Sequence, residues 1–217
     1  MAANGTVSAA ASKVTRRKGI AALVGLVVLG AIVIDTKVVT IGGEEDVRQQ
    51  AFNPDRFGAE EFPRIRDFVT GKAPEAVQLG EDLAVDKNAA IAAYGTMAGA
   101  FPVMAVNFTG IVGEGVSGIF EVSVDGLPDG AGIRVQTGPA INGTELRDIT
   151  GDIEFGAFKN QIEFQDAGAG INRAMAAEAL SDLDREALTG KTVNVTGVFT
   201  MINPKNWLVT PVAFEVQ

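Results

Sequence analysis

The sequence predicts an α+β protein, mainly β, with an amino-terminal transmembrane helix, a helical segment and then an OB-like five-stranded barrel that has one helix between its strands. Residues 19–34 form an uncharged apolar run. Beyond Gly99 the apolar residues alternate with a period of two, which is typical of strands. The segments then run as strands, one helix and two more strands, an order that fits the OB-fold.

Composition limits the chemistry open to the chain. Its 217 residues, 47% apolar and 21% charged, suffice for one domain with a buried core plus an appendage. There is no cysteine and no histidine, which removes thiol nucleophiles, Cys/His zinc sites and the usual general base. We therefore expect no cofactor. The basic residues before Asp35 come without any acidic one, so the remainder is strongly acidic, which argues against nucleic acid as a partner.

The amino-terminal region predicts a single-pass anchor. We expect residues 1–14 to be a disordered cytoplasmic tail and 15–36 a transmembrane signal-anchor. The sixteen-residue apolar run spans about 24 Å and needs flanking lysines to cross a bilayer. The basic cluster Lys13–Lys18 predicts a cytoplasmic amino terminus. No small-x-small cleavage site follows the run, so the anchor is expected to stay in the bacterial inner membrane, with the bulk of the chain in the periplasm.

Residues 37–100 predict a helical stalk or lid. Apolar residues recur at helical spacing at Phe62, Ile65, Phe68 and Val69, with Pro63 in the first turn. A second helix is predicted over Glu81–Tyr94, closed by Gly95.

Residues 101–217 predict the barrel. The glycines of the first long strand indicate the bulges or corners that a small closed barrel needs, at Gly110, Gly113, Gly115 and Gly118. One helix is predicted over 171–188. The predicted strands are 101–112, 116–126, 131–139, 153–165, 191–201 and 207–216.

Residues 147–165 are the densest stretch in polar side chains. Two carboxylates there could form a catalytic pair only if they converged in a cleft. Along the predicted strand, Asp152 and Glu154 lie on one face, which is more simply the solvated one. No D-x-D-x-D-G calcium loop is present. We therefore predict no catalytic and no metal-ligating residue.

Six residues are candidates for ligand or partner binding. We favour an Arg147–Asp148 clasp that fixes a loop over a ligand contact, and we expect Asp148→Ala to destabilise the fold, with Glu163→Ala and Asp166→Ala nearly silent. Trp207 is either a plug of the barrel or a stacking platform for a sugar or a partner. The candidates are Arg147, Asp148, Asn160, Gln161, Gln165 and Trp207.

A family resemblance rests on four segments. GPAINGTELRD, FGAFKNQIEFQ, LDREALTGKTVNVTGVF and NPKNWLVTPVAFEV together resemble DUF2291, a family of bacterial membrane-anchored periplasmic proteins described as predicted lipoproteins. The resemblance implies an accessory role beside ribose-type sugar ABC transporters and no established activity. Because this chain has no cysteine, an uncleaved helix must provide the anchoring.

Three functional hypotheses follow. The preferred one is a non-enzymatic accessory protein that binds a sugar ABC transporter or its solute-binding protein at the membrane. The alternatives are a periplasmic carbohydrate-active enzyme that uses the carboxylates of residues 147–166, and a free-standing sugar-binding module that depends on Trp207.

Overall fold

The structure is a computed structural model that describes residues 52–217, which form one compact unit. The predicted cytoplasmic tail, the signal-anchor and the start of the predicted stalk lie outside these residues. Within them, no helix combines the length and the apolar character needed to cross a membrane.

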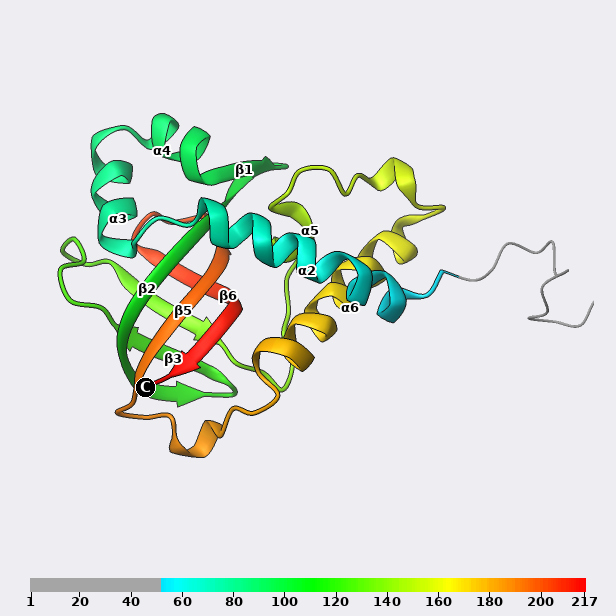
Figure 1. The fold of residues 1–217 in the computed structure, drawn as a ribbon. Coiled ribbons are helices and arrows are strands. Elements are labelled where there is room, and N and C mark those ends of the chain that lie inside the picture. The colour runs from blue at the N-terminus through cyan, green and yellow to red at the C-terminus, as the bar shows by residue number, and fades with distance from the viewer. Residues whose placement is uncertain (1–51) are drawn as a thin grey trace, which may run out of the picture. The chain divides into compact units, whose positions relative to one another are not determined.

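The described fold is built around a closed barrel (Figure 1). Its strands follow the order β2-β3-β4-β6-β5, and β5 pairs again with β2 to close the ring. All of these pairs are antiparallel except β4 with β6, which are parallel. The strands are β2 (Phe101–Val116), β3 (Ile119–Ser123), β4 (Gly132–Gln136), β5 (Thr192–Thr200) and β6 (Asn206–Val216). This is the OB order, so the predicted barrel is confirmed, and β1 (Gly95–Ala98) pairs in addition with the first residues of β2.

The long strand β2 makes the closure possible. Its first part pairs with β5 and its last part with β3, and the register shifts between Val112 and Gly115. A Cβ at Gly115 would lie 2.3 Å from the Phe120 ring, so a glycine at this position leaves room for that ring against the bulged strand. The bulge predicted from the glycines is present at this position.

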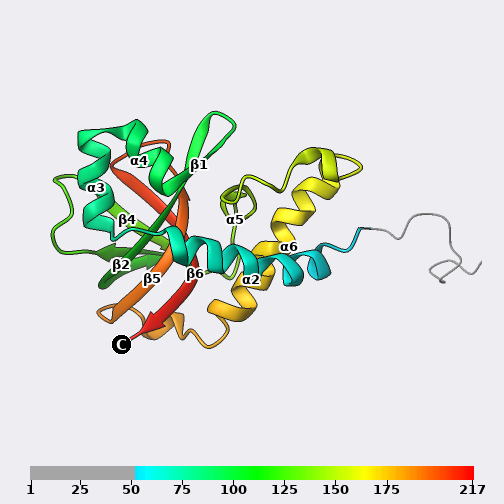
Figure 2. The same cartoon turned by 45° about the horizontal axis from the view of Figure 1, so that its top comes forward.

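Two hydrophobic cores share the sheet. The interior of the barrel is filled by large side chains that include Met104, Phe108, Phe199 and Trp207. A second core lies on the outer face of β2, β5 and β6, where the helices α2 (Pro54–Lys72) and α6 (Gln161–Ala179) pack side by side (Figure 2). Both cores exclude water almost completely.

The helices before residue 101 belong to these cores. α2 contributes Phe62, Ile65 and Val69 to the outer core. α3 (Ala76–Val85) closes one end of the barrel by inserting Ala76 and Leu79 into its interior. The helices expected as a stalk or lid therefore share their buried side chains with the barrel.

Two predicted helices differ in their limits. The helix expected around Phe62–Val69 runs over Pro54–Lys72, because Asn53 caps its amino terminus. Pro63, expected in the first turn, lies inside the helix, and Pro54 takes the first position instead. The helix expected over 81–94 is two helices, α3 and α4 (Lys87–Tyr94). They break at Asp86, whose carboxylate accepts hydrogen bonds from the amides of Asn88 (2.9 Å) and Ala89 (3.0 Å).

The strand predicted over 153–165 is wrong. The segment holds a 3-10 turn at Phe155–Ala157 and the start of α6. The Asn160 side chain accepts from the Glu163 amide (2.9 Å), and the Glu163 carboxylate accepts from the Lys159 amide (3.0 Å). This reciprocal cap starts a helix where a short apolar alternation alone fits either period.

The helix predicted over 171–188 is shifted for the same reason. α6 begins ten residues earlier, at Gln161, and ends at Ala179. The chain then continues through a 3-10 turn at Arg185–Ala187 to β5. A short helix, α5 (Glu145–Asp148), also lies between β4 and β5, so the strands are separated by more than the single helix predicted.

The crossing of α2 and α6 depends on two glycines. A Cβ at Gly58 would lie 2.2 Å from the carbonyl of Gly170, and a Cβ at Gly170 would lie 1.9 Å from the Pro54 carbonyl oxygen. Real Cβ atoms do not approach backbone this closely, so the two helices touch backbone to backbone. Any side chain at either position must push them apart.

We predict that Gly58→Ala destabilises the protein by about 1–3 kcal/mol, because the added methyl group overpacks the helix crossing. Gly71→Ala in the same helix is the matched control, since a Cβ there meets nothing within 4 Å. By helix propensity it should be neutral or stabilising by up to about 1 kcal/mol. Thermal unfolding of both variants checks the prediction, and equal melting temperatures would contradict it.

Candidate functional site

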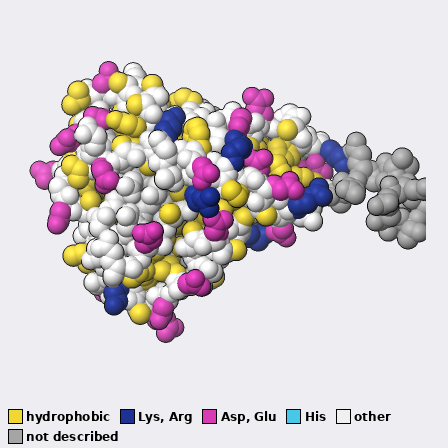
Figure 3. Space-filling model, in the orientation of Figure 1, with side chains coloured by type: hydrophobic (Ala, Val, Ile, Leu, Met, Phe, Trp, Pro, Cys, Tyr) yellow, Lys and Arg dark blue, Asp and Glu magenta, His cyan; other side chains and the backbone are white. Residues whose placement is uncertain are grey.

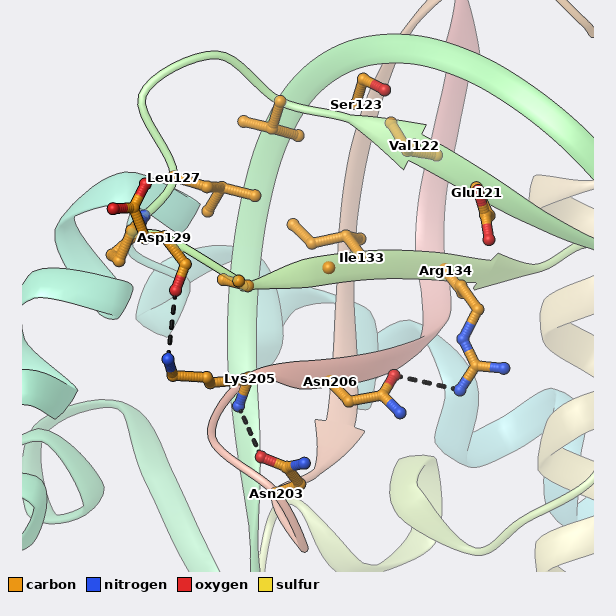
Figure 4. A pocket seen from close by; sticks show the side chains of 15 residues that line it. Glu121, Val122, Ser123, Leu127, Asp129, Ile133, Arg134, Asn203, Lys205 and Asn206 are labelled. Atoms are coloured by element: carbon orange, nitrogen blue, oxygen red, sulfur yellow. Dashed lines mark hydrogen bonds between the residues drawn. The ribbon is translucent and has the colours of Figure 1, made fainter.

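A polar groove lies on the outer face of β3 and β4 (Figure 4). It has a volume of about 850 Å³ and opens to solvent. Its walls are the loop 124–131, which joins β3 to β4, and the segment 203–206, which leads into β6. OB-folds bind their ligands on the face of the second and third strands of the barrel. In this protein those two strands are β3 and β4.

The strand register explains the hollow. Glu121 on β3 lies opposite Arg134 on β4, and Gly132 lies opposite Asn206 on β6. A Cβ at Gly132 would meet nothing within 4 Å. The missing side chain at Gly132 therefore leaves an open floor in the middle of a row of polar side chains.

The polar groups of the groove are held by short contacts. Arg134 donates from Nη2 to Asn206 Oδ1 (3.1 Å). Lys205 donates from Nζ to the Asp129 carbonyl (3.2 Å), and its amide donates to Asn203 Oδ1 (2.9 Å). A guanidinium has five N–H donors, so Arg134 retains capacity for a ligand.

The groove is chemically suited to hydrogen bonding with a polar ligand of little net charge. Its ionisable side chains are two acids, Glu121 and Asp129, and two bases, Arg134 and Lys205. None of the described residues that line it is aromatic, so a sugar would find no ring to stack on. Nor is there a group of three or more Asp and Glu side chains placed to hold a metal ion within residues 52–217.

Sequence reasoning missed this groove. Its side chains are the outward positions of two short alternating strands, IFEVS and GIRVQ, beside the turn LPDG. The signal available was Gly132, a glycine at an outward position of β4 two residues before Arg134. The sequence does not show that β6 joins β4 in parallel and brings Asn206 to the same face.

Arg147 and Asp148 form a bidentate ion pair in α5. Arg147 Nε donates to Asp148 Oδ1 (2.7 Å) and Nη2 donates to Oδ2 (3.1 Å). Arg147 also donates from Nη1 to the Phe164 carbonyl (3.1 Å), and its guanidinium lies 3.7 Å from the centre of the Phe164 ring. With only 7% of Arg147 exposed, this pair ties α5 to α6 rather than facing solvent.

The other sequence candidates are dispersed. Asn160 caps α6, and Gln161 and Gln165 are exposed on its first turns. Trp207 is fully buried, stacks on Phe199 with ring centres 4.9 Å apart, and donates from Nε1 to the Pro204 carbonyl (2.8 Å). It thus fills the barrel, and its indole presents no surface to a sugar.

The carboxylates of the 147–166 stretch have separate partners. Asp148 pairs with Arg147 and Glu163 caps α6. Asp152 accepts from Thr150 and from Arg64, and these bonds hold the pKa of its carboxyl below the usual value. Glu154 and Asp166 are exposed. Glu163 therefore stabilises the start of α6, whereas the predicted strand implied a solvated side chain without a structural role.

The fold defines the class of protein. It is similar to the crystal structure of an OB-fold protein from Thermotoga maritima, with a TM-score of 0.62 and 19% sequence identity, over 77% of this chain and all of that one. At this identity the likeness shows the fold alone. No curated protein matches the chain.

Residues 22–215 match DUF2291, described as predicted periplasmic lipoprotein. The chain belongs to this family, as its four motif segments predicted.

We predict that Asp148→Ala lowers the stability of the fold by about 1–3 kcal/mol, because it leaves the buried Arg147 without its anion. Glu163→Ala should cost about 0.5–1 kcal/mol through the lost cap. Asp166→Ala, at an exposed position of the same helix, is the control and should stay within about 0.5 kcal/mol. Thermal melts rank the three, and a silent Asp148→Ala would refute the structural role of the pair.

Glu145 gives a pH-dependent prediction. Burial raises the pKa of its carboxyl, which the hydrogen bond from Thr200 (3.2 Å) only partly offsets. The folded state therefore holds this proton more tightly than the unfolded chain, and stability is lost as the pH rises through the folded pKa. Glu145→Gln should raise the melting temperature at neutral pH. The gain should vanish below about pH 4.3, the unfolded value; a gain independent of pH would contradict the assignment.

Proposed function

We propose that this protein is a non-enzymatic, membrane-anchored periplasmic accessory protein that binds a component of a ribose-type sugar ABC transporter through the groove on β3 and β4. The observation that carries the proposal is the chemistry of the groove. The groove presents acidic and basic side chains that can form hydrogen bonds, and they stand on a sheet whose strands are paired on both sides. Such a surface suits a polar protein segment.

The strand pairing supports recognition by side chains. β3 is paired on both sides, with β2 and β4, and β4 is paired with β3 and β6. Neither strand has a free edge, so a partner cannot add a strand to the sheet there. Its contacts must be made with Glu121, Arg134, Lys205 and the two asparagines that frame the groove.

The distribution of carboxylates favours a binding role over catalysis. The carboxylates weighed for a glycosidase belong to caps and ion pairs, as in Glu163 and Asp148, or lie on the exposed surface. A glycosidase needs two carboxyl groups facing one cleft. The link to sugar transport is the role that the family resemblance implies, and the anchor is the apolar run at residues 19–34.

A photoreactive amino acid at Ser123, in the groove, tests the proposal in the full-length chain in its own host. Irradiation should give an adduct with a transporter subunit or its solute-binding protein, identified by mass spectrometry. The matched control is the same amino acid at the exposed Glu114, outside the groove on the preceding strand. Arg134→Ala should abolish the adduct, because it removes the central donor.

Adducts that form equally well from Glu114 would contradict the groove as the binding surface. The sugar-binding alternative has its own readout, since Trp207 is the only tryptophan and its barrel position adjoins the groove residue Asn206. A saturable change of its fluorescence on titration with ribose would favour that alternative. A Glu163→Ala protein that is fully stable but no longer complements sugar transport would favour the enzyme.

A further inference from the structure

Five phenylalanines gather at one end of the described fold, far from the groove. They come from the residues just before α2 and its first turn, from the 3-10 turn before α6 and the residue after it, and from the first turn of α6. Figures 1 and 2 show these segments side by side at the end opposite the loop that joins β3 to β4. We call this end the aromatic tip: Phe52, Phe57, Phe155, Phe158, Phe164 and the neighbouring Ile162.

The rings of the aromatic tip form one continuous cluster. Phe52 and Phe57 each contact Phe158, with ring centres 5.5 and 5.6 Å apart. Phe158 contacts Phe164 at 5.4 Å, and Phe164 contacts Phe155 at 5.7 Å. Aromatics are only 6% of the chain and five of its 12 phenylalanines lie here, so the cluster is a concentrated feature.

The cluster is rigid yet incompletely covered. Arg147 fixes Phe164 in place, because its guanidinium donates to the Phe164 carbonyl and lies over the Phe164 ring. Phe155 is nevertheless 50% exposed and Ile162 is 69% exposed. Figure 3 shows hydrophobic side chains at the surface at this end of the molecule, among charged groups of both signs. A fixed apolar surface of this kind marks a place of contact.

The position of the tip in the chain indicates what it contacts. Phe52, the first described residue, is itself part of the cluster. Only residues 35–51 separate it from the apolar run that ends at Ile34. The tip is therefore the part of the fold with the shortest tether to the bilayer that the run enters. Aromatic side chains are favoured at the headgroup level of membranes.

We propose that the aromatic tip docks on the phospholipid surface, with Phe155 and Ile162 inserted among the headgroups. The inference rests on the membrane anchoring included in the proposed function, and not on its transporter partner. Docking at this end directs the loop between β3 and β4, and the groove beside it, away from the bilayer (Figure 1).

The charges around the tip identify apolar insertion as the driving contact. Arg173 pairs with Asp55 (2.7 Å) and Arg56 with Glu60 (3.8 Å). Lys159 is accompanied by Glu154 and Asp166. With acidic and basic groups mixed in this way, anionic lipid gives little net attraction. Docking should therefore occur on zwitterionic phosphatidylcholine.

The cysteine-free sequence makes a direct test simple. The full-length chain carrying Gln161→Cys, beside Ile162, is labelled with a fluorophore and reconstituted in phosphatidylcholine vesicles. Lipids brominated near the headgroup should quench this label. The matched control, Asp125→Cys in the exposed loop between β3 and β4, should keep its emission. In a Phe155→Ser/Ile162→Ser background the quenching at Gln161→Cys should be lost, while Trp207 emission reports that the fold is intact.

Equal emission from Gln161→Cys in plain and brominated vesicles would overturn the proposal. An emission spectrum that reports an apolar environment of the label, without bromine quenching, would also overturn it. The tip would then be covered by residues 37–51, a second copy or another protein. Quenching seen only with anionic lipid would refute apolar insertion. Failure of the groove to cross-link a transporter component leaves these results unchanged, so the two proposals can fail separately.

Discussion

The close crossing of α2 and α6 is the constraint on which the rest of the described fold depends. A barrel of this order buries one face of its strands inside, and β2, β5 and β6 still need cover outside. The helix pair supplies that cover only because Gly58 and Gly170 let the backbones touch. Ile65, Ile171 and Met175 are then fully buried together against the sheet.

The same crossing determines what lies at the ends of the two helices. α2 and α6 run out from the barrel side by side, so their amino termini bring Phe57 and Phe164 into one cluster. Arg147 extends the connection inward, because it pairs with Asp148 in α5 and holds the first turn of α6. One buried guanidinium thus links the segment after β4 to the aromatic tip. The Arg147–Asp148 pair resembles a polar binding site in the sequence, but in the molecule it connects α5 to α6.

The proposed activities belong to opposite ends of this arrangement. The aromatic tip is apolar and follows the tether, whereas the groove is polar and lies over β3 and β4. The sheet connects them rigidly, since strands β2 to β6 form a closed ring. A protein built this way can hold a polar recognition surface at a fixed distance from a membrane without any moving part.

The sequence by itself determined the barrel, because a period of two, bulge glycines and a helix before the last two strands are local signals that leave few topologies. It also determined the family and the pairing of Arg147 with its neighbour Asp148. Only the structure showed that residues 161–165 start a helix, since the local cap formed by Asn160 and Glu163 outweighs a short apolar alternation that fits both periods. The groove and the aromatic tip were decided by the tertiary structure. Their residues are far apart in the chain, and only the parallel pairing of β4 with β6 and the glycine crossing of α2 with α6 bring them together.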